Sequence, residues 1–282
     1  MATQAPTEAN AELVADVLWG FGPVAIEEQT GPEGPVLLAG FVDLTVAEAA
    51  AAAVGTAGFG VARTVPLDDD GLDGWRRWAR VEHAAPFTIV PAWLDAPAVA
   101  EGCVDADSVG RHVLRIEPGR TFGSGSHPTT RLVLGSLTRL VTPGCSVLDV
   151  GCGSGILSVA VAVLGAEPVF GIDIDESAPT VTAANAKVNG VAGAVSASTK
   201  PLAEMAAPTD GFDLVLANVL APVVVAHAED LVRLVAPDGA LVVSGLLVDR
   251  WTATTDHLSG LAVVDVAVDD GWVAVTLRSP PG

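Results

Sequence analysis

The sequence predicts an α/β fold built on a mostly parallel sheet and preceded by a small α+β domain. An apolar run over residues 146–150 leads into the turn Gly-Cys-Gly-Ser-Gly at 151–155, and a helical pattern follows. A second β-branched run over 168–172 ends at Asp173. Strand, turn, helix and strand make a βαβ unit, which joins strands of a parallel sheet. Before residue 65 the order is helix, strand, strand, helix, strand, which indicates a separate α+β unit.

The N-terminal order matches a ferredoxin-like β-α-β-β-α-β unit that lacks its first strand. Residues 1–10 are polar and typical of a frayed terminus, so no strand is expected there. Thr45-Val-Ala-Glu48 has the spacing of a capping box, which opens a helix. The expected elements are a helix over 11–21 capped by Asn10, strands over 24–28 and 36–42, an alanine-rich helix from Thr45 to about Gly58, and a strand over 59–65.

An acidic stretch with proline and glycine at 66–74 marks the end of this unit. We therefore divide the chain into a small α+β domain over 1–65, a connecting segment over 66–112 and a larger domain over 113–282. A chain of 282 residues with a hydrophobic fraction of 50% is long and apolar enough to bury the cores that this division requires.

The larger domain alternates strands and helices, as a doubly wound sheet requires. Its last two strands flank Asp269-Asp270-Gly271, whose Asp-Gly pair favours a tight hairpin, so the chain should close with an antiparallel pair. Asn185 and Asn189 fall four residues apart on one face of an expected helix. The further expected elements are strands over 87–90, 113–116, 212–217 and 240–244, helices over 156–164, 175–188, 201–207, 221–235 and 248–258, and hairpin strands over 261–268 and 272–278.

The glycine turn and Asp173 predict a nucleoside site. In an open parallel sheet ligands bind outside the carboxyl ends of the strands, where Gly151, Gly153 and Asp173 would meet. The carboxylate suits ribose hydroxyls, and glycines let a ligand approach the backbone, whose amides would face it. The spacing G-x-G-x-G differs from the G-x-G-x-x-G of dinucleotide sites and offers no clear pyrophosphate cradle. The alternative is a tight turn without a ligand, and the position of Asp173 argues against it.

A second glycine-rich segment, 121–130, precedes an expected helix. Pro128 suits the first turn of that helix, and Ser126 or His127 suits its cap. We expect free amides at this helix start to face the ligand and to favour a carboxylate. Thr130 falls on the first turn, where its hydroxyl can reach the same ligand. His127 could act as a general base, but a histidine at a helix start more often makes local hydrogen bonds.

Asn218 follows the apolar strand expected over 212–217, so the same sheet rule places it at the ligand edge. Its amide carbonyl can accept a hydrogen bond from a nitrogen. Asn218 is therefore a candidate catalytic residue that orients an attacking amine. The alternative is an ordinary residue of the turn after a strand.

Four motifs of the chain resemble those of the PrmA family. They are Phe122-Gly-Ser-Gly-Ser-His127-Pro-Thr-Thr130, Val147-Leu-Asp-Val-Gly-Cys-Gly-Ser-Gly-Ile-Leu157, Gly171-Ile-Asp-Ile-Asp175 and Ala217-Asn218-Val-Leu-Ala221. The glycine turn is common to many class I methyltransferases and specifies only the cofactor, whereas the first motif is much more specific. The resemblance is strong from about Glu117 to Arg278 and weaker before that.

The resemblance implies the fold and the chemistry of an S-adenosylmethionine-dependent methyltransferase, with the catalytic domain over 113–282. The implied fold is the class I methyltransferase fold, a Rossmann-like, mostly parallel seven-stranded sheet with an antiparallel final strand. Members of the family methylate amino groups of a large-subunit ribosomal protein, which a small N-terminal domain holds. That domain corresponds to 1–65 here. Because its first strand is not expected, either residues 1–10 pair poorly as an edge or the domain is abbreviated. The implied catalytic residue is Asn218, and the implied cofactor-binding residues are Phe122, His127, Thr130, Gly151, Gly153, Asp173 and Asn218.

Composition narrows the choice of partners. The chain has 34 acidic and 14 basic residues and a formal net charge of −20. Direct nucleic-acid binding is not expected, because it depends on Lys and Arg that neutralise phosphates. An acidic surface would attract a basic protein such as a ribosomal protein, although acidity also maintains solubility.

The sequence also carries expectations about location and ligands. No basic, apolar-cored segment opens the chain, and no apolar run reaches the ~20 residues of a membrane helix, so we expect a cytoplasmic location. We also expect a monomer. The three cysteines have no C-x-x-C spacing, and no metal site or disulfide framework is expected.

Two other interpretations share the same βαβ unit. One keeps the cofactor but changes the acceptor to another protein or a small molecule, since the start of the chain departs from the family pattern. The other is an NAD-dependent oxidoreductase or a non-catalytic nucleotide-binding module, because a βαβ unit by itself does not define a function.

Overall fold

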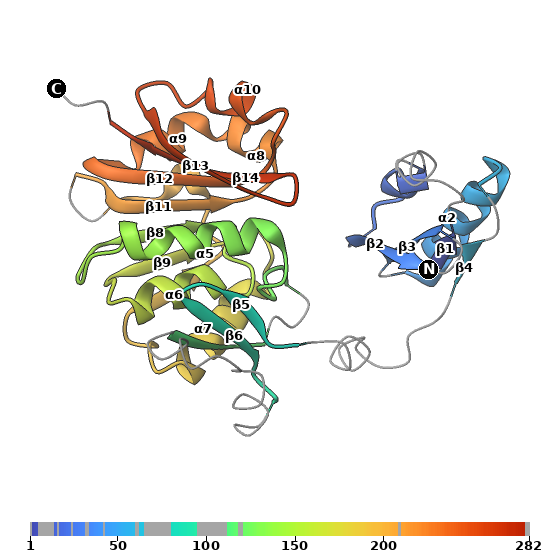
Figure 1. The fold of residues 1–282 in the computed structure, drawn as a ribbon, viewed down its shortest axis with the longest axis horizontal. Coiled ribbons are helices and arrows are strands. Elements are labelled where there is room, and N and C mark those ends of the chain that lie inside the picture. The colour runs from blue at the N-terminus through green and yellow to red at the C-terminus, as the bar shows by residue number, and fades with distance from the viewer. Residues whose placement is uncertain are drawn as a thin grey trace. The chain divides into compact units, whose positions relative to one another are not determined.

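The computed structural model describes residues 2–4, 14–15, 17–23, 25–31, 34–41, 43–59, 62–64, 80–94, 112–117, 121–207 and 210–279. The chain separates into two compact units, Met1–Trp75 and Arg76–Gly282 (Figure 1). The expected cap Asn10 and the boundary stretch 66–74 lie outside the described residues. The three-part division of the chain stays a prediction.

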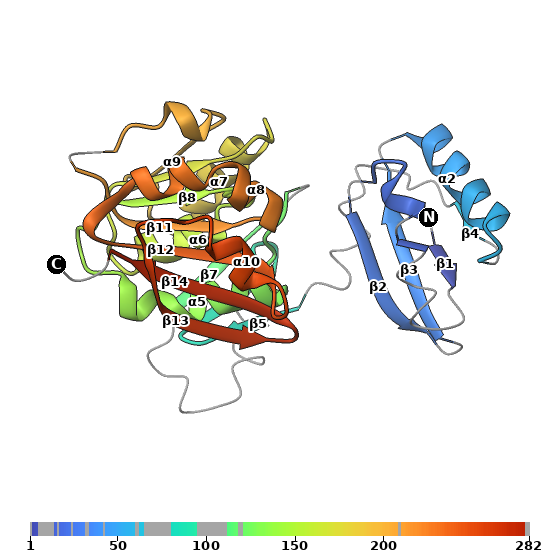
Figure 2. The same ribbon diagram turned by 90° about the horizontal axis from the view of Figure 1, so that it is seen from above.

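The N-terminal unit contains a four-stranded sheet in the order β2-β3-β1-β4 among its described residues (Figure 2). The central strand β1 pairs antiparallel with β3 on one side and with β4 on the other. The prediction that the first strand is missing is therefore wrong. β1 has only three residues and is held by backbone hydrogen bonds to two neighbouring strands. It therefore does not need the alternation of apolar residues by which longer strands are recognised in a sequence. The strands are β1 (Ala2–Gln4), β2 (Ala25–Gly31), β3 (Gly34–Gly40) and β4 (Ala62–Arg63).

Helical segments complete the core of this unit. Residues 14–15 and 17–19 are helical, and α2 (Leu44–Thr56) follows β3. With β1 restored, the unit has the strand and helix order of the ferredoxin-like pattern. Its buried core consists of Val14, Leu18, Leu37, Ala39, Ala50 and Val54.

Asp43 caps α2, so the capping box predicted at Thr45 is wrong. The Asp43 carboxylate accepts hydrogen bonds from the amides of Thr45 at 2.7 Å and Val46 at 3.4 Å. These bonds lower the pKa of Asp43. The helix begins at Leu44, which makes Thr45 one of the residues whose free amide needs a cap rather than the cap itself.

The larger unit is built on a seven-stranded sheet in the order β10-β9-β8-β11-β12-β14-β13. Neighbouring strands from β10 to β12 pair in parallel, and β14 runs antiparallel to both β12 and β13. The predicted Rossmann-like sheet with an antiparallel final strand is confirmed. The strands are β8 (Val147–Val150), β9 (Val169–Ile172), β10 (Val195–Ser198), β11 (Phe212–Asn218), β12 (Val235–Leu247), β13 (Ala262–Asp269) and β14 (Trp272–Arg278).

Helices cover both faces of this sheet, as the alternation of buried residues in β11 shows. Leu214 and Leu216 pack into one core and Val215 and Ala217 into the other, because successive side chains of a strand point to opposite faces. The first core includes α5 (Pro128–Leu140), α6 (Ile156–Val163) and α7 (Ala178–Val188). The second includes α8 (Ala221–Ala226), α9 (Ala228–Arg233) and the segment around α10 (Trp251–Thr255).

A separate three-stranded sheet adds to the first core. It consists of β5 (Glu82–Ala84), β6 (Phe87–Pro91) and β7 (His112–Ile116), with β6 in the centre. Phe87, Ile89, Leu114 and Ile116 from this sheet are buried in the same cluster as the side chains of α5 and α6. The strands predicted over 87–90 and 113–116 are thereby confirmed.

The closing hairpin is confirmed, whereas several other elements differ from the prediction. Asp270 and Gly271 both have positive φ, 46° and 77°, as a two-residue hairpin turn of type I′ requires. The helix expected over 221–235 divides at His227 into α8 and α9, and the segment 201–207 contains only the 3₁₀ turn η2 (Leu202–Glu204). Strand β12 starts before the expected residue 240, through a register shift opposite β11.

No helix among the described residues has the length and apolarity to cross a membrane.

Replacing Asp43 should loosen the start of α2. In Asp43→Ala the amides of Thr45 and Val46 lose their acceptor, so their hydrogen exchange should become faster. Glu48→Ala is the matched control, because the wrongly predicted capping box would depend on Glu48. Exchange measured by NMR or mass spectrometry over 44–48 checks this, and faster exchange in the Glu48 variant alone would contradict the assignment of the cap.

Candidate functional site

The glycines of the turn after β8 are required by contacts within the protein. Gly151, Gly153 and Gly155 have φ of 72°, 51° and 75°, which side chains rarely adopt. A Cβ on Gly151 would lie 2.5 Å from Val219, and one on Gly153 would lie 2.5 Å from the carbonyl oxygen of Phe122. The expectation that these glycines leave room for a ligand is thus incomplete, because protein atoms already occupy the space beside them.

The amides of this turn are also used within the chain. Gly151 and Cys152 donate to the carbonyl of Ile172, and Ser154 donates to that of Phe122. The remaining amides, those of Gly153, Gly155 and Ile156, donate to Asp173 Oδ2, Cys152 O and Ser154 Oγ. The expectation that turn amides face the ligand is therefore wrong.

A turn with no spare amide cannot cradle a pyrophosphate, which needs donors. Among the described residues none donates a hydrogen bond to the carbonyl of Gly151. A free carbonyl oxygen can accept a hydrogen bond from a cationic donor, such as the ammonium group in the methionine part of S-adenosylmethionine. The turn therefore fits S-adenosylmethionine better than it fits a dinucleotide.

Asp173, at the carboxyl end of β9, keeps acceptor capacity for a ligand. Its Oδ2 accepts from the Gly153 amide at 2.8 Å, and its Oδ1 accepts from the Asp175 amide at 2.9 Å. These two bonds fix the carboxylate beside the turn. Each carboxylate oxygen has a second lone pair, so each can still accept a hydrogen bond from one ribose hydroxyl.

His127 caps α5, and Pro128 occupies the first turn as predicted. The Nδ1 atom of His127 accepts from the Thr129 amide at 3.3 Å, and the His127 carbonyl accepts from the Thr130 amide. Pro128 has no amide hydrogen. The expectation of free amides at this helix start is therefore wrong, because the cap satisfies them.

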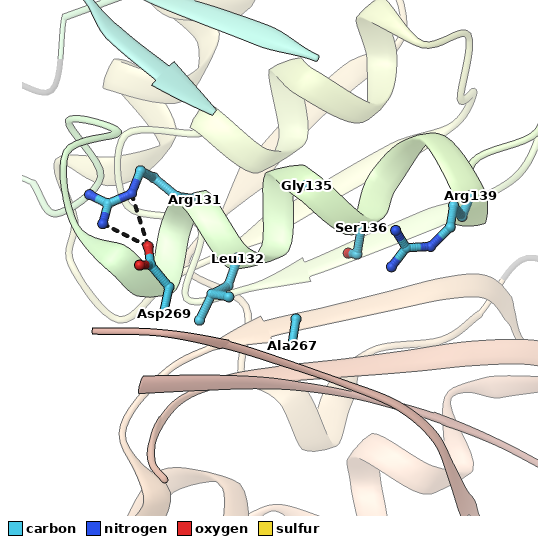
Figure 3. A pocket seen from close by; sticks show the side chains of 7 residues that line it. All are labelled: Arg131, Leu132, Gly135, Ser136, Arg139, Ala267 and Asp269. Carbon is cyan, nitrogen blue, oxygen red and sulfur yellow. Dashed lines mark hydrogen bonds and ion pairs between the residues drawn. The ribbon is translucent and has the colours of Figure 1, made fainter. Parts of the chain in front are cut away.

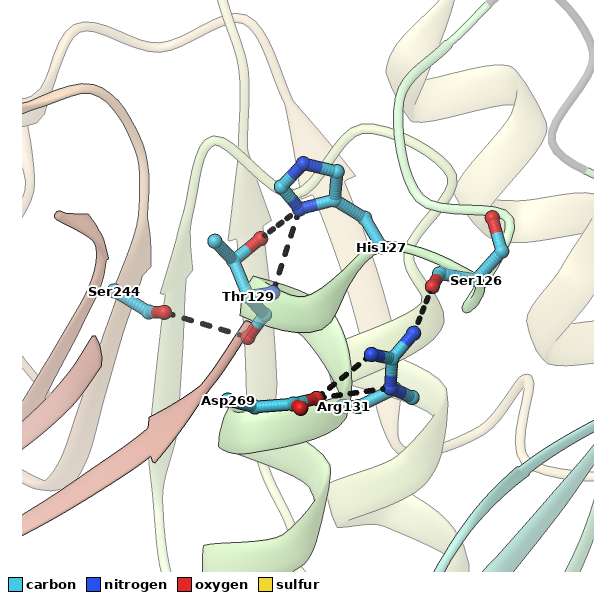
Figure 4. A network of polar contacts seen from close by, with 6 residues as sticks. All are labelled: Ser126, His127, Thr129, Arg131, Ser244 and Asp269. Atoms are coloured by element: carbon cyan, nitrogen blue, oxygen red, sulfur yellow. Dashed lines mark hydrogen bonds and ion pairs between the residues drawn. The ribbon is translucent and has the colours of Figure 1, made fainter. Parts of the chain in front are cut away.

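Polar contacts attach the start of α5 to the sheet (Figure 4). Arg131 binds Asp269 at the end of β13 through Nε and Nη2, at 3.2 and 2.7 Å, and donates through Nη1 to the carbonyl of Ser126. Ser244, in β12, donates to the carbonyl of Thr129 at 3.3 Å. These contacts hold the residue before the cap and the first turn of the helix beside the ends of β12 and β13.

His127 stands between two aromatic rings. The ring centroids of Phe122 and Trp272 lie 5.5 and 5.1 Å from that of His127, both in edge-to-face arrangements. Burial lowers the pKa of His127, Arg131 lowers it further, and Asp270 opposes the shift. A lowered pKa favours the neutral ring, which leaves Nδ1 free to accept the bond that caps the helix. This arrangement supports the local role expected for His127 over the role of a general base.

Asn218 and Thr130 contact each other across the site. Asn218 is the last residue of β11, and its Nδ2 donates to Thr130 Oγ1 at 3.4 Å. Thr130 is fully buried, whereas Asn218 is partly exposed. Thr130 uses one of the two amide hydrogens of Asn218, so the amide oxygen and the second N–H can still bind other groups.

The contacts described above bring all the predicted site residues to one edge of the sheet. Asp173 binds the turn, Phe122 accepts from it, and Val219, next to Asn218, packs on it. Their roles in binding and catalysis stay predictions. The residues joined in this way are Phe122, His127, Thr130, Gly151, Gly153, Asp173 and Asn218.

No role was assigned to Asp149 from the sequence. This buried acid lies in β8, two residues before the glycine turn. Its Oδ2 accepts from the amide and the hydroxyl of Ser158, at 3.0 and 2.6 Å. It therefore caps α6, because the residue at the cap position, Gly155, has no side chain to do so. Its Oδ1 has no hydrogen-bond partner among the described residues. Burial raises the pKa of Asp149 to about 6, although the bonds from Ser158 oppose that shift. An acid within an apolar strand, two residues before the turn, was the available signal.

A hollow lies beside α5 (Figure 3). It measures about 220 Å³, opens between α5 and β13, and contains none of the predicted site residues. No group of three or more His, Cys, Asp or Glu side chains that could hold a metal is found in the described parts of the chain.

The sequence matches a known family and its members. Residues 42–280 match the model of the family described as ribosomal protein L11 methyltransferase (PrmA). A protein of that name from Citrifermentans bemidjiense is 34% identical over 224 residues, which cover 77% of this chain and 69% of that protein. The protein of the same name from Geobacter sulfurreducens is 40% identical over 224 residues, which cover 77% and 68%.

The comparison with solved structures finds the same kind of protein as the comparison of sequences. The crystal structure of a ribosomal protein L11 methylase from Lactobacillus delbrueckii subsp. bulgaricus has a TM-score of 0.61 to this chain, at 27% sequence identity. The match covers 71% of this chain and 97% of that one.

The buried carboxyl of Asp149 should make stability depend on pH. Its pKa of about 6 lies above the unfolded value of 3.8, so the folded state binds the proton more tightly. The stabilisation is complete below about pH 4 and is lost as the pH rises through about 6, a change of about 3 kcal/mol in the free energy of unfolding. Asp149→Asn should lack this loss, since the amide does not titrate.

The test is urea unfolding of both proteins from pH 4 to 7. The contributions of all other acids cancel in the difference between the two curves. Parallel curves over this range would contradict the raised pKa of Asp149.

Proposed function

Because this chain belongs to the PrmA family of ribosomal protein L11 methyltransferases, we propose that it transfers methyl groups from S-adenosylmethionine to amino groups of ribosomal protein L11. The observation that carries the proposal is the match of residues 42–280 to that family. The site agrees with it, since Asp173 and the Gly151 carbonyl offer acceptors suited to a ribose and an ammonium group.

The cofactor supplies an electrophilic methyl group on a sulfonium sulfur. The lone pair of the target nitrogen forms the new N–C bond while the C–S bond breaks, and the electron pair of that bond stays on sulfur in S-adenosylhomocysteine. The protein contributes by aligning nitrogen, methyl carbon and sulfur, which can supply several kcal/mol of the barrier.

Asn218 is proposed to orient the target nitrogen. Thr130 engages its amide nitrogen, so its amide oxygen can accept a hydrogen bond from the amine. A lysine amine with a pKa of ~10.4 is mostly protonated at neutral pH and must lose a proton before it attacks. An amide is no base of that strength, and a backbone carbonyl is itself an amide, so the proton passes to water.

Further roles are proposed on the same basis. Five residues would bind the cofactor or form the surface of its site: Phe122, His127, Gly151, Gly153 and Asp173. Ile174, which follows Asp173 and is fully exposed, offers an apolar surface for the base of the nucleoside.

We also propose a role for the rest of the chain. The small domain over 1–65 would recognise the ribosomal protein, and its four described strands support a complete rather than an abbreviated domain. The net charge of −20 suits a basic partner and opposes direct binding of nucleic acid. The protein would act as a monomer in the cytoplasm.

Methylation of ribosomal protein L11 is the direct test. Purified L11 from the same organism is incubated with the enzyme and S-adenosylmethionine and examined by intact-mass spectrometry. Mass gains in steps of one methyl group are expected. In Asn218→Ala, kcat should fall about 10- to 100-fold, and the affinity for S-adenosylhomocysteine should fall less. If the wild-type protein binds S-adenosylhomocysteine but leaves L11 unmodified, the acceptor is a different molecule.

The affinity for S-adenosylhomocysteine should depend on Asp173 and not on its neighbour Asp175. A hydrogen bond to a charged group contributes about 1.5–3 kcal/mol, so Asp173→Ala should raise the Kd by about 10- to 150-fold. Asp175→Ala keeps the amide that donates to Asp173 Oδ1, and should change the Kd little.

Isothermal titration calorimetry on both variants, with their melting temperatures as a check of folding, measures the difference. An unchanged Kd in the Asp173 variant would refute its role. An equal rise in both variants would assign the effect to the loop and not to the carboxylate.

A further inference from the structure

Asn185 of α7 connects the glycine turn to the segment that precedes the site. Its Nδ2 donates to the carbonyls of Ser154 at 2.8 Å and Glu117 at 2.9 Å, and its Oδ1 accepts from the Glu117 amide at 2.9 Å. The side chain is 1% exposed, so these bonds are shielded from water. One amide thus uses both of its donor hydrogens and its acceptor on two different segments.

Ser154 continues this connection to the loop that carries Phe122. Its amide donates to the Phe122 carbonyl at 2.9 Å, and its hydroxyl donates to the Gly123 carbonyl at 2.7 Å. Asn185 therefore fixes Glu117 directly and fixes Phe122 and Gly123 through Ser154. Both ends of the segment 117–123 are tied to the turn that follows β8.

We propose that Asn185 is a positioning residue for cofactor binding, which sets the spacing between the glycine turn and the Phe122 segment. This rests on the proposed function, in which a nucleoside cofactor contacts both of these segments. Without the Asn185 amide, the buried carbonyl of Ser154 loses its donor, and the two segments lose their shared anchor. The cofactor would then have to order them as it binds, which weakens its affinity.

Asn189, one helical turn later, provides a matched comparison. Its Oδ1 accepts from the Arg115 amide at 2.9 Å, and its Nδ2 donates to the carbonyls of Arg115 and Asn185, both at 2.8 Å. It pairs with β7 in the same way as Asn185 pairs with Glu117. It makes no hydrogen bond to the glycine turn among those found in the described residues. Loss of either side chain removes three hydrogen bonds, but only loss of Asn185 frees the turn.

The experiment compares Asn185→Ala with Asn189→Ala in the full-length protein. Both should lower the melting temperature by similar amounts. Calorimetric titration with S-adenosylhomocysteine should give a Kd raised about tenfold or more in the Asn185 variant and within about threefold of the wild type in the Asn189 variant. Hydrogen exchange at 121–123 and 151–156 should become faster only in the Asn185 variant.

The outcomes separate this inference from the proposed function. No binding by the wild-type protein would refute the proposed cofactor, whereas normal wild-type binding with equal Kd values in the two variants would refute the role of Asn185. If the alanine variants do not fold, Asn185→Ser and Asn189→Ser, which keep one hydroxyl donor, are compared in the same way. A Kd that follows the melting temperature in all variants would show a purely structural role and overturn the proposal.

Discussion

The buried glycine turn after β8 must satisfy its own polar backbone groups, and the rest of the site depends on this requirement. Within the turn the Gly155 amide bonds to the carbonyl of Cys152, and more distant segments supply most of the other partners. Ile172 and Asp173 come from the end of β9, Phe122 from the loop before α5, and Thr182 and Asn185 from α7. The same bonds that satisfy the turn therefore bring the elements of the cofactor site together. The site is held in place by the fold before any ligand binds.

Local patterns in the sequence were sufficient for the elements that hold the site. The βαβ unit and the Asp270-Gly271 hairpin depend on neighbouring residues, and the parallel-sheet rule was enough to place Asp173 and Asn218 at one edge. Such local patterns could not show which backbone groups of the turn are already hydrogen-bonded within the protein. The partners of these groups lie up to 32 residues away along the chain, as with Ser154 and Phe122, and only their meeting in space shows that no amide remains for a ligand.

Other differences have the same physical origin. Strand β1 is recognised by its pairing with β3 and β4, because three residues are too few for a hydrophobic period. Asp43 takes the cap of α2 because the helix begins one residue before the expected threonine, and helix ends are the least certain feature of a sequence pattern. Asp149 was visible as an acid in an apolar strand, but its role as the cap of α6 required the position of Ser158.

The two asparagines of α7 have a consequence for the solubility of the chain. Strand β7 is the outer strand of its three-stranded sheet, and such an edge can pair with strands of other molecules and start aggregation. Asn185 and Asn189 occupy backbone groups of Arg115 and Glu117 along that edge with side-chain amides. These side-chain amides thus satisfy backbone groups at the edge of the sheet that would otherwise pair with a further strand. The backbone groups bound in this way are not available to a strand of another molecule.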